Sequence, residues 1–210
     1  YQAGQNADWV LIDPPETDAE GPVRTFSFVS APHEPVLKIA TRMRDTAFKR
    51  TLKNMPEGGA ISFEGPLGSF LLHENTARPA IFLAGGIGIT PLHSMISDAT
   101  ARKLPHKIIL FYSNRRPEDT AYLDELQAFA KENPNFTLVA TMTDMEKSAK
   151  AWDGERGYID AAMLARHVPE GTSPLYYISG PQAMVAAMRT MLTGAGVSND
   201  DIRFEEFAGY

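Results

Sequence analysis

Three glycines follow a short apolar run in the stretch 82-FLAGGIGITPL-92. Gly85, Gly86 and Gly88 carry no Cβ atom, so the backbone there can approach a ligand closely. Thr90 is a good N-cap residue, and Pro91 suits the first turn of a helix. A strand, a glycine loop and an exposed helix N-terminus together predict a pyrophosphate site. The stretch lacks the G-x-G-x-x-G fingerprint, so a tight structural turn is the alternative.

A second glycine turn, Gly180-Pro181, occurs in the stretch 175-LYYISGPQAM-184, again between an apolar run and a predicted helix. Open α/β sheets bind ligands at the carboxyl edge of their strands. The two turns therefore predict one ligand site at one sheet edge, although each turn alone also fits an ordinary strand-to-helix connection.

The stretch 24-RTFSFVS-30 alternates side chains between the two faces of a predicted strand. Arg24, Phe26 and Phe28 lie on one face, with Thr25 and Ser27 on the other. An arginine beside an aromatic ring can bind a phosphate and cover a flat ring such as a flavin. The alternative is a strand whose aromatic residues only fill a core.

Composition excludes several classes of function. The chain of 210 residues has 43% hydrophobic residues and no cysteine, which rules out disulfides, thiolate zinc sites and iron–sulfur clusters within it. A net charge of −6 argues against nucleic-acid binding. The five histidines are scattered, so we predict no metal site. No apolar run reaches the length of a membrane span and no targeting pattern is present, so we predict a soluble, cytoplasmic protein.

The window 38–53 departs from this acidic balance, with six basic residues and one acidic residue, a local charge of +5. A solvated helix face explains such a window, and so does an anion site or a docking surface for an acidic partner. Both interpretations stay open at this point. Reversing the charges of Arg42 and Lys53 would test the docking surface.

The elements that must position these residues form two groups. The first third alternates apolar and polar residues between Gly/Pro turns, which predicts a small antiparallel barrel or sandwich with one helix at 46–55. Its predicted strands are 9–12, 25–30, 36–41, 61–64 and 70–72. Because the sequence begins at Tyr1 as if within a structure, we expect further residues upstream.

From about residue 79 apolar strands alternate with amphipathic helices, which predicts a parallel sheet covered by helices. The predicted strands are 80–85, 107–113, 136–141, 175–180 and 202–207. The predicted helices are 91–103, 121–131, 161–166 and 181–192. We therefore predict two domains, an antiparallel β-barrel at 1–75 and an α/β domain at 76–210.

Four motifs, in this order, resemble the signatures of the ferredoxin-NADP reductase superfamily of flavin-dependent oxidoreductases. They are Arg24-Thr-Phe-Ser27, Gly85-Gly-Ile-Gly-Ile-Thr-Pro91, Ser179-Gly-Pro-Gln-Ala-Met184 and Glu205-Glu-Phe207. The resemblance implies a flavin-binding barrel followed by an NAD(P)-binding α/β domain.

The resemblance also implies roles on the flavin side. Arg24 would hold the flavin phosphate, Phe26 would pack on the isoalloxazine ring, and Ser27 would lie near N5, which receives the hydride. At the helix start where the family carries a further phosphate contact, this chain has Thr46 and Lys49. The other expected cofactor-binding residues are Thr25 and Thr41. Two phosphates of FAD account better for the positive window than the single phosphate of FMN.

On the nicotinamide side, the resemblance implies that the first glycine loop and Thr90 bind the coenzyme pyrophosphate. Gly180, Pro181 and Met184 would line the nicotinamide. Ser179 stands where many relatives carry cysteine. Glu205 would complete the site, so that Ser27, Ser179 and Glu205 are the expected catalytic residues. Phe207 or Tyr210 would cover the flavin or its adenine.

Coenzyme choice depends on the end of the second α/β strand, 111-FYSNRRPEDTAY-122. Ser113, Arg115 and Arg116 favour NADPH, because its 2′-phosphate needs cations or hydroxyls. Glu118 and Asp119 follow at once, so NADH stays the alternative.

These observations predict an enzyme that passes hydride from NAD(P)H to FAD and electrons to a one-electron acceptor such as a ferredoxin or a haem protein. The alternatives are a reductase that uses free flavin as its substrate and a module that binds nucleotide or flavin without catalysis. The sequence carries no prediction of oligomeric state.

Overall fold

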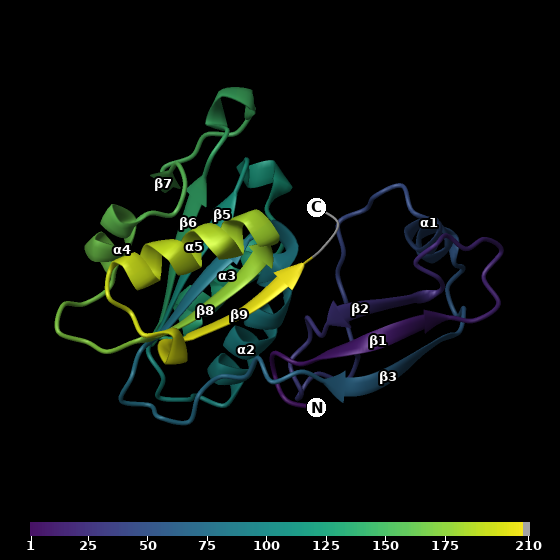
Figure 1. Cartoon of the computed structure of the whole chain (residues 1–210), viewed down its shortest axis with the longest axis horizontal. Coiled ribbons are helices and arrows are strands. Elements are labelled where there is room, and N and C mark those ends of the chain that lie inside the picture. Colours follow the sequence, from purple (N-terminus) through teal and green to yellow (C-terminus); the bar gives the residue numbers. More distant parts are fainter. Residues whose placement is uncertain (208–210) are drawn as a thin grey trace.

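The computed structural model describes residues 1–207, in which an antiparallel sheet lies beside a larger parallel sheet (Figure 1). The antiparallel sheet has the strand order β2-β1-β3, formed by β1 (Asn6–Leu11), β2 (Val23–Ser27) and β3 (Ile61–Leu67). Helix α1 (Ala47–Asn54) packs its buried Phe48 into the core of this half, against Trp9 and Phe28. The predicted helix at 46–55 is thereby confirmed.

The predicted barrel is only partly confirmed, since the described residues form three antiparallel strands without closure. The segment 36–41 is not a strand. The Lys38 carbonyl accepts from the backbone N–H of Val29 at 2.8 Å, but the Lys38 N–H donates to the Ser30 hydroxyl, so this single backbone bond does not extend into a ladder. The segment 70–72 is not a strand either. Gly68, at a φ of +87°, turns the chain towards the parallel sheet, and Phe70 packs in the core there. The boundary between residues 75 and 76 stays a prediction.

The parallel sheet has the order β7-β6-β5-β4-β8-β9, and its strand pairs are all parallel. The strands are β4 (Ala80–Gly85), β5 (Ile108–Asn114), β6 (Phe136–Met142), β7 (Glu155–Arg156), β8 (Leu175–Pro181) and β9 (Ile202–Phe207). The five predicted strands are confirmed, and the two-residue β7 is an addition to them. From β4 the chain moves to β5 on one side, whereas β8 lies on the other, so the strand order reverses between β4 and β8. Such a reversal is where open α/β sheets bind ligands.

Helices cover both faces of this sheet. They are α2 (Ile89–Ala101), α3 (Leu123–Glu132), α4 (Ala161–His167) and α5 (Gln182–Gly194), joined by 3₁₀ turns at Gly86–Gly88, Pro117–Asp119, Met145–Lys147 and Asn199–Asp201. Residues of α2 and α3 share one core cluster, and residues of α4 and α5 share a second cluster with the opposite face of the strands. The four predicted helices are confirmed with small shifts of their ends.

Helix α2 also joins the two halves of the molecule. It is buried almost all round because one side packs on the parallel sheet and the other side meets the antiparallel half. The Ser94 hydroxyl donates to the Ser30 carbonyl at 2.6 Å, and Nδ1 of His93 lies 3.0 Å from the Val29 carbonyl. These buried contacts hold the end of the 24–30 stretch against the carboxyl end of the parallel sheet.

Candidate active site

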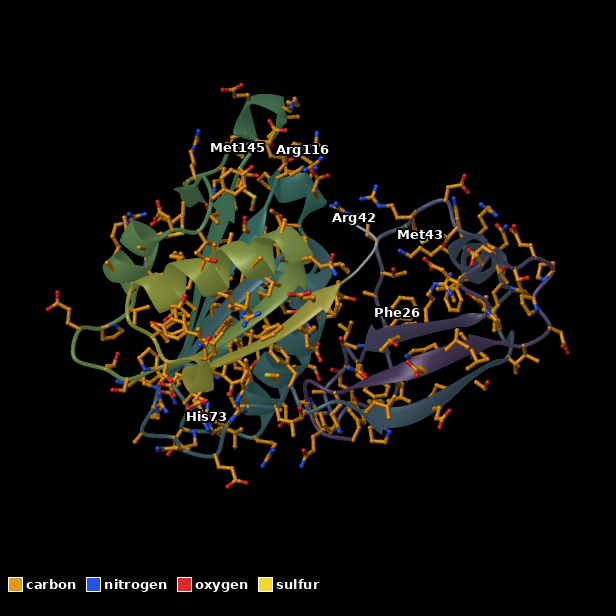
Figure 2. The ribbon with its side chains drawn as sticks, in the orientation of Figure 1. Phe26, Arg42, Met43, His73, Arg116 and Met145 are labelled. Atoms are coloured by element: carbon orange, nitrogen blue, oxygen red, sulfur yellow. The ribbon has the colours of Figure 1, made fainter. Side chains whose placement is uncertain are left out.

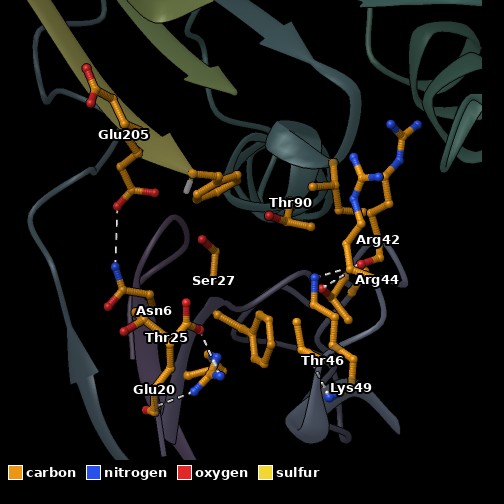
Figure 3. Close-up of a pocket in the computed structure, with 17 residues that line it drawn as sticks. Asn6, Glu20, Thr25, Ser27, Arg42, Arg44, Thr46, Lys49, Thr90 and Glu205 are labelled. Carbon is orange, nitrogen blue, oxygen red and sulfur yellow. Dashed lines mark hydrogen bonds and ion pairs between the residues drawn. The ribbon is translucent and has the colours of Figure 1, made fainter. Parts of the chain in front are cut away.

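A cavity of about 510 Å³ lies where the antiparallel half meets the carboxyl ends of the parallel strands (Figure 3). The arrow of β9 points towards it (Figure 1). Ten of the residues singled out in the sequence line this cavity: Arg24, Thr25, Phe26, Ser27, Thr41, Thr46, Lys49, Thr90, Glu205 and Phe207. They come from segments far apart in the sequence, which the fold brings to one place.

The 24–27 stretch supplies one wall of the cavity. All four of its residues line the cavity, although alternate side chains point to opposite faces of β2. This is possible because β2 is an edge strand of its sheet. Ser27 is buried and lies at the centre of the view in Figure 3, and Phe26 lines the same cavity.

Arg24 is held in place by carboxylates and backbone oxygens. One terminal nitrogen lies 3.1 Å from Asp18 and 2.8 Å from Glu20, and the other donates to the backbone carbonyls of residues 20, 21 and 23. Its guanidinium also lies 5.3 Å from the centre of the Phe48 ring. The arginine is therefore pre-positioned at the wall, with most of its donors already engaged.

Cations gather at one end of the cavity, where Arg42, Arg44 and Lys49 lie together (Figure 3). The ammonium of Lys49 donates to the Arg42 carbonyl at 2.7 Å. Burial lowers the pKa of Lys49, and the charges of Arg44 and Arg24 lower it further. Thr46 caps α1 by accepting a hydrogen bond from the Lys49 backbone at 3.3 Å. This end of the cavity is suited to an anion.

A carboxyl group stands at the opposite end. Burial raises the pKa of Glu205 to about 7, against a smaller opposing effect of the hydrogen bond that Asn6 donates to Oε1 at 3.4 Å. Its other oxygen, Oε2, is buried without a hydrogen-bond partner among the described residues. The cavity is thus cationic at one end and carries a group that titrates near neutral pH at the other.

The glycine turns pack against each other. A Cβ on Gly88 would lie 2.3 Å from the Ser179 carbonyl oxygen, and one on Gly85 would lie 2.3 Å from the Met184 sulfur. A Cβ on Gly180 would lie 3.2 Å from the backbone nitrogen of Gly85. Close approach of two strand ends therefore requires these glycines, whatever ligand the loop binds.

The prediction that Thr90 caps the following helix is wrong. Gly86–Gly88 form a 3₁₀ turn that runs directly into α2, so the helix begins at Ile89 with Gly88 as its N-cap. Thr90 is instead a buried residue of the first turn, and Pro91 follows it inside the helix. The Thr90 side chain faces the cavity as one of its lining residues.

Ser179 is fully buried on β8, and its Oγ has no hydrogen-bond partner among the described residues. It pairs with Glu205 on β9, so the two side chains share a face of the sheet. Pro181 and Met184 pack against Gly85. The glycine turn and the 179–184 stretch do not line the cavity through Gly85, Gly86, Gly88, Pro91 or any residue of 179–184. These residues belong to the ends of β4 and β8 and to the starts of the helices that follow.

The loop after β5 does not line the cavity, although the charge of the cavity residue Arg42 reaches Asp119. Arg116 is beside Met145 near one end of the parallel-sheet half, whereas Phe26 is in the antiparallel half (Figure 2). Arg116 donates two hydrogen bonds to Asp119, at 2.8 and 3.0 Å, which raise the pKa of the guanidinium and lower that of the carboxyl. Arg115 is exposed. Arg116, the cation that would bind the 2′-phosphate of NADPH, is therefore already paired with Asp119.

The structure divides the basic window into three groups. Lys38 pairs with Glu34 at 2.7 Å, and Arg50 pairs with Glu16 and Asp45. The second group consists of the cations that line the cavity: Arg42, Arg44 and Lys49. Lys53 is exposed at the far end of α1. Of the two residues whose charge reversal would test docking, Arg42 lines the cavity and Lys53 does not.

Seven cavity residues were not among the predicted site residues: Asn6, Glu20, Ala40, Arg42, Arg44, Ile87 and Glu206. Only the two arginines carried a signal in the sequence, the local positive charge. Tyr210, one of the two residues expected to cover the flavin, lies outside the described residues. Within residues 1–207 no group of three metal-ligating side chains comes together, and no helix is long and apolar enough to cross a membrane.

Comparison with known proteins identifies the fold. The family model of the oxidoreductase NAD-binding domain matches residues 82–190, more than half of the chain. The chain belongs to this family. The match, together with the structural neighbours described next, confirms the resemblance to the ferredoxin-NADP reductase superfamily.

Relatives of known structure share both halves. A cytochrome P450 reductase from Amycolatopsis superposes with a TM-score of 0.80 at 25% identity, over 99% of this chain and 61% of that one. A ferredoxin NADP⁺ reductase from Neisseria gonorrhoeae, solved with FAD and NADP, superposes with a TM-score of 0.78 at 22% identity, over 98% of this chain and 87% of that one.

Among curated sequences, one of the subunits of the Na⁺-translocating NADH-quinone reductase from Pseudoalteromonas atlantica is 29% identical over 160 residues. The alignment covers 74% of this chain and 39% of that relative. The chain thus spans well under half the length of the curated relatives it matches.

Proposed function

We propose that this chain catalyses the transfer of hydride from NAD(P)H to FAD and passes the electrons on to a one-electron acceptor, such as a ferredoxin or a haem protein. One observation carries the proposal. The 24–27 strand, the start of α1 and the end of β9 meet at one cavity, at the point where the order of the parallel strands reverses. Family membership and the names of the relatives support it.

The residues of the cavity fit a flavin with phosphates. Phe26 offers a ring to a flat ligand, and the cationic end offers charge to phosphates. Glu205 lines the cavity, and its buried, unpartnered Oε2 is a polar group that a ligand would satisfy. Bound FAD would supply the chemistry, since flavins accept hydride and release electrons singly.

This chain's residues would orient and enclose the reactants. Arg24 and the cationic end would hold the phosphates, while Ser27 would hydrogen-bond the reacting edge of the ring. Ser179 would stand at the nicotinamide side, next to Glu205 on the neighbouring strand. Below a pH of about 7 the Glu205 carboxyl holds a proton, which Oε2 would present to the site.

The test is an anaerobic visible spectrum of the purified protein, recorded before and after adding NADPH and, separately, NADH. We expect a yellow flavin band that bleaches with at least one coenzyme. Retention of stoichiometric flavin excludes the free-flavin reductase, in which the flavin leaves after each turnover. A colourless protein that reduces added flavin would establish that alternative, and a protein that binds flavin without oxidising either coenzyme would be a binding module.

For the coenzyme we propose NADPH, with Arg116 taking its 2′-phosphate in exchange for Asp119. Arg116→Ala should then lower kcat/KM for NADPH by about tenfold and leave the value for NADH unchanged. Asp119→Asn should act in the opposite direction by freeing the arginine. Equal losses with both coenzymes in Arg116→Ala would show that the arginine only supports the loop, and NADH would replace NADPH in the proposal.

For the acceptor we propose an acidic surface that meets the exposed cations of the basic window 38–53. Lys53 is the better test residue, because Arg42 lines the cavity and its reversal would disturb flavin binding as well. Lys53→Glu should raise the apparent KM for the acceptor at low salt, and added salt should remove the difference. Lys131→Glu, on exposed α3 in the other half, is the matched control.

A further inference from the structure

Asn6 joins the antiparallel sheet to the last strand of the parallel sheet across the cavity (Figure 3). Its Nδ2 donates to Oε1 of Glu205 at 3.4 Å, although the two residues are 199 positions apart. Asn6 is the first residue of β1 and lies opposite Ser27 in the register of β1 and β2. Asn6 therefore contacts one expected catalytic residue, Glu205, through its side chain and is paired with another, Ser27, through the backbone.

The structure holds this amide in a restricted place. Gly68 lies against it, so that a Cβ at position 68 would be 3.0 Å from Asn6 Nδ2. The register of β1 and β3 also shifts here, because Asn6 faces Leu67 whereas Asp8 faces Glu64. One extra residue on β3 produces this shift, and such irregularities redirect the side chains beside them. Both Gly68 and the irregular pairing of β3 therefore restrict where the Asn6 side chain can lie.

The contact divides the two oxygens of the carboxyl group. Oε1 accepts from Asn6, while Oε2 is buried and has no partner among the described residues. Without the amide, the carboxyl group could rotate and exchange the two oxygens. We propose that Asn6 is the positioning residue of Glu205, holding Oε1 so that Oε2 alone meets the reacting ligand. This role rests on the proposed function.

Among the described residues, Asn6 is the polar group that makes a hydrogen bond to the Glu205 carboxyl, and the charged groups nearby do not. Arg203, two residues earlier on β9, donates instead to the Leu71 carbonyl at 2.6 Å. The remaining ionisable groups of the cavity and of the 68–74 segment make no hydrogen bond to Glu205 among the described residues: Glu20, Arg24, Arg42, Arg44, Lys49, His73, Glu74 and Glu206. Burial and Asn6 are the two influences that set the pKa of Glu205.

The first experiment needs no flavin. The full chain is labelled with ¹³C at glutamate carboxyl carbons and titrated by NMR, and the Glu205 signal is the one missing from Glu205→Gln. We expect Asn6→Ala to raise the midpoint of that titration by about one pH unit, because a donor to the ionised form is lost. Asn6→Asp keeps the shape of the side chain and should raise the midpoint further through like-charge repulsion.

Gln5→Ala is the matched control. Gln5 is the neighbouring amide and donates to the Gly68 carbonyl at 3.2 Å, so its loss disturbs the same turn without touching Glu205. It should leave the midpoint unchanged. Equal midpoints in Asn6→Ala and Gln5→Ala would overturn the proposal, and so would an unchanged midpoint in Asn6→Asp.

A second measurement separates this proposal from the proposed function. In flavin-loaded protein, the pH profile of coenzyme-driven bleaching should move with the NMR midpoint in both Asn6 variants. A moved midpoint with no bleaching in the wild-type protein would refute the proposed function and, with it, the reacting ligand at Oε2. If the protein bleaches but the pH profile of bleaching is the same in the wild type and in both Asn6 variants, the positioning role is refuted and the proposed function is not.

Discussion

Replacing Glu205 by glutamine should make the protein more stable at alkaline pH, although it removes a site residue. Burial raises the pKa of this carboxyl from 4.5 to about 7. A carboxyl with a raised pKa in the folded state binds its proton more tightly there than in the unfolded state, so its contribution favours folding at low pH and is lost as pH rises. A difference of about two and a half pH units, at about 1.4 kcal/mol each, corresponds to about 3 kcal/mol.

The loss should occur between pH 4.5 and about pH 8. We expect urea unfolding of the wild-type protein to lose about 3 kcal/mol over this window relative to Glu205→Gln, because the glutamine stays neutral throughout. Glu206→Gln is the control, since Glu206 is the exposed neighbour on the same strand. If the difference between wild type and Glu205→Gln stays constant across the window, the carboxyl is already solvated or paired in the folded protein. The reasoning on its burial would then be wrong.

Three further outcomes follow from the same geometry. Gly88→Ala should destabilise the protein by about 3 kcal/mol in thermal unfolding, because its Cβ would meet the Ser179 carbonyl at 2.3 Å; Gly194→Ala, with nothing within 4 Å, should be neutral or stabilising by up to about 1 kcal/mol. Thr46→Ala should cost about 1 kcal/mol, because α1 loses the cap that accepts from Lys49, and an unchanged melting temperature would contradict that cap. Pyrophosphate at about ten times its dissociation constant should add about 1.4 kcal/mol of stability, and Lys49→Gln should weaken this gain.

The parallel half could be predicted from the sequence almost element by element. Its four central strands, β4, β5, β6 and β8, are mostly apolar and buried, and the segments between them carry Gly, Pro or a polar run, so local pattern and final structure agree there. The exception is the start of α2, where Thr90 and Pro91 form a good local signal for a helix start. The helix instead begins earlier, at Ile89, because the 3₁₀ turn at Gly86–Gly88 packs closely against β8 and runs directly into the helix.

The antiparallel half was harder to predict, because alternation does not tell which strands pair. The segment 36–41 alternates as a strand should, yet it makes one backbone hydrogen bond, from Val29 to the Lys38 carbonyl, and the next donor pairs with the Ser30 hydroxyl instead. Phe70 packs in the core of the parallel half, so its apolar side chain does not indicate a strand of the antiparallel sheet. Both errors come from contacts between segments that are distant in the sequence, which a period of two cannot reveal.

The site itself shows the same division. Arg24, Phe26 and Ser27 were singled out through a motif, and all three line the cavity. Asn6 carried no such signal, because an asparagine near a strand start is ordinary and only the fold brings it to Glu205.

The arrangement of charge in the cavity gives the basic window its physical meaning. The chain has a net charge of −6, yet three of its cations gather at one place. Burial lowers the pKa of Lys49, and repulsion from Arg44 and Arg24 lowers it further. The repulsion among these cations opposes folding, but the same cluster attracts an anion once the cavity has formed. At the other end, burial keeps Glu205 neutral over most of the acidic range, so it does not cancel the attraction. A ligand with phosphates at one end and a ring that exchanges protons at the other would satisfy both ends at once.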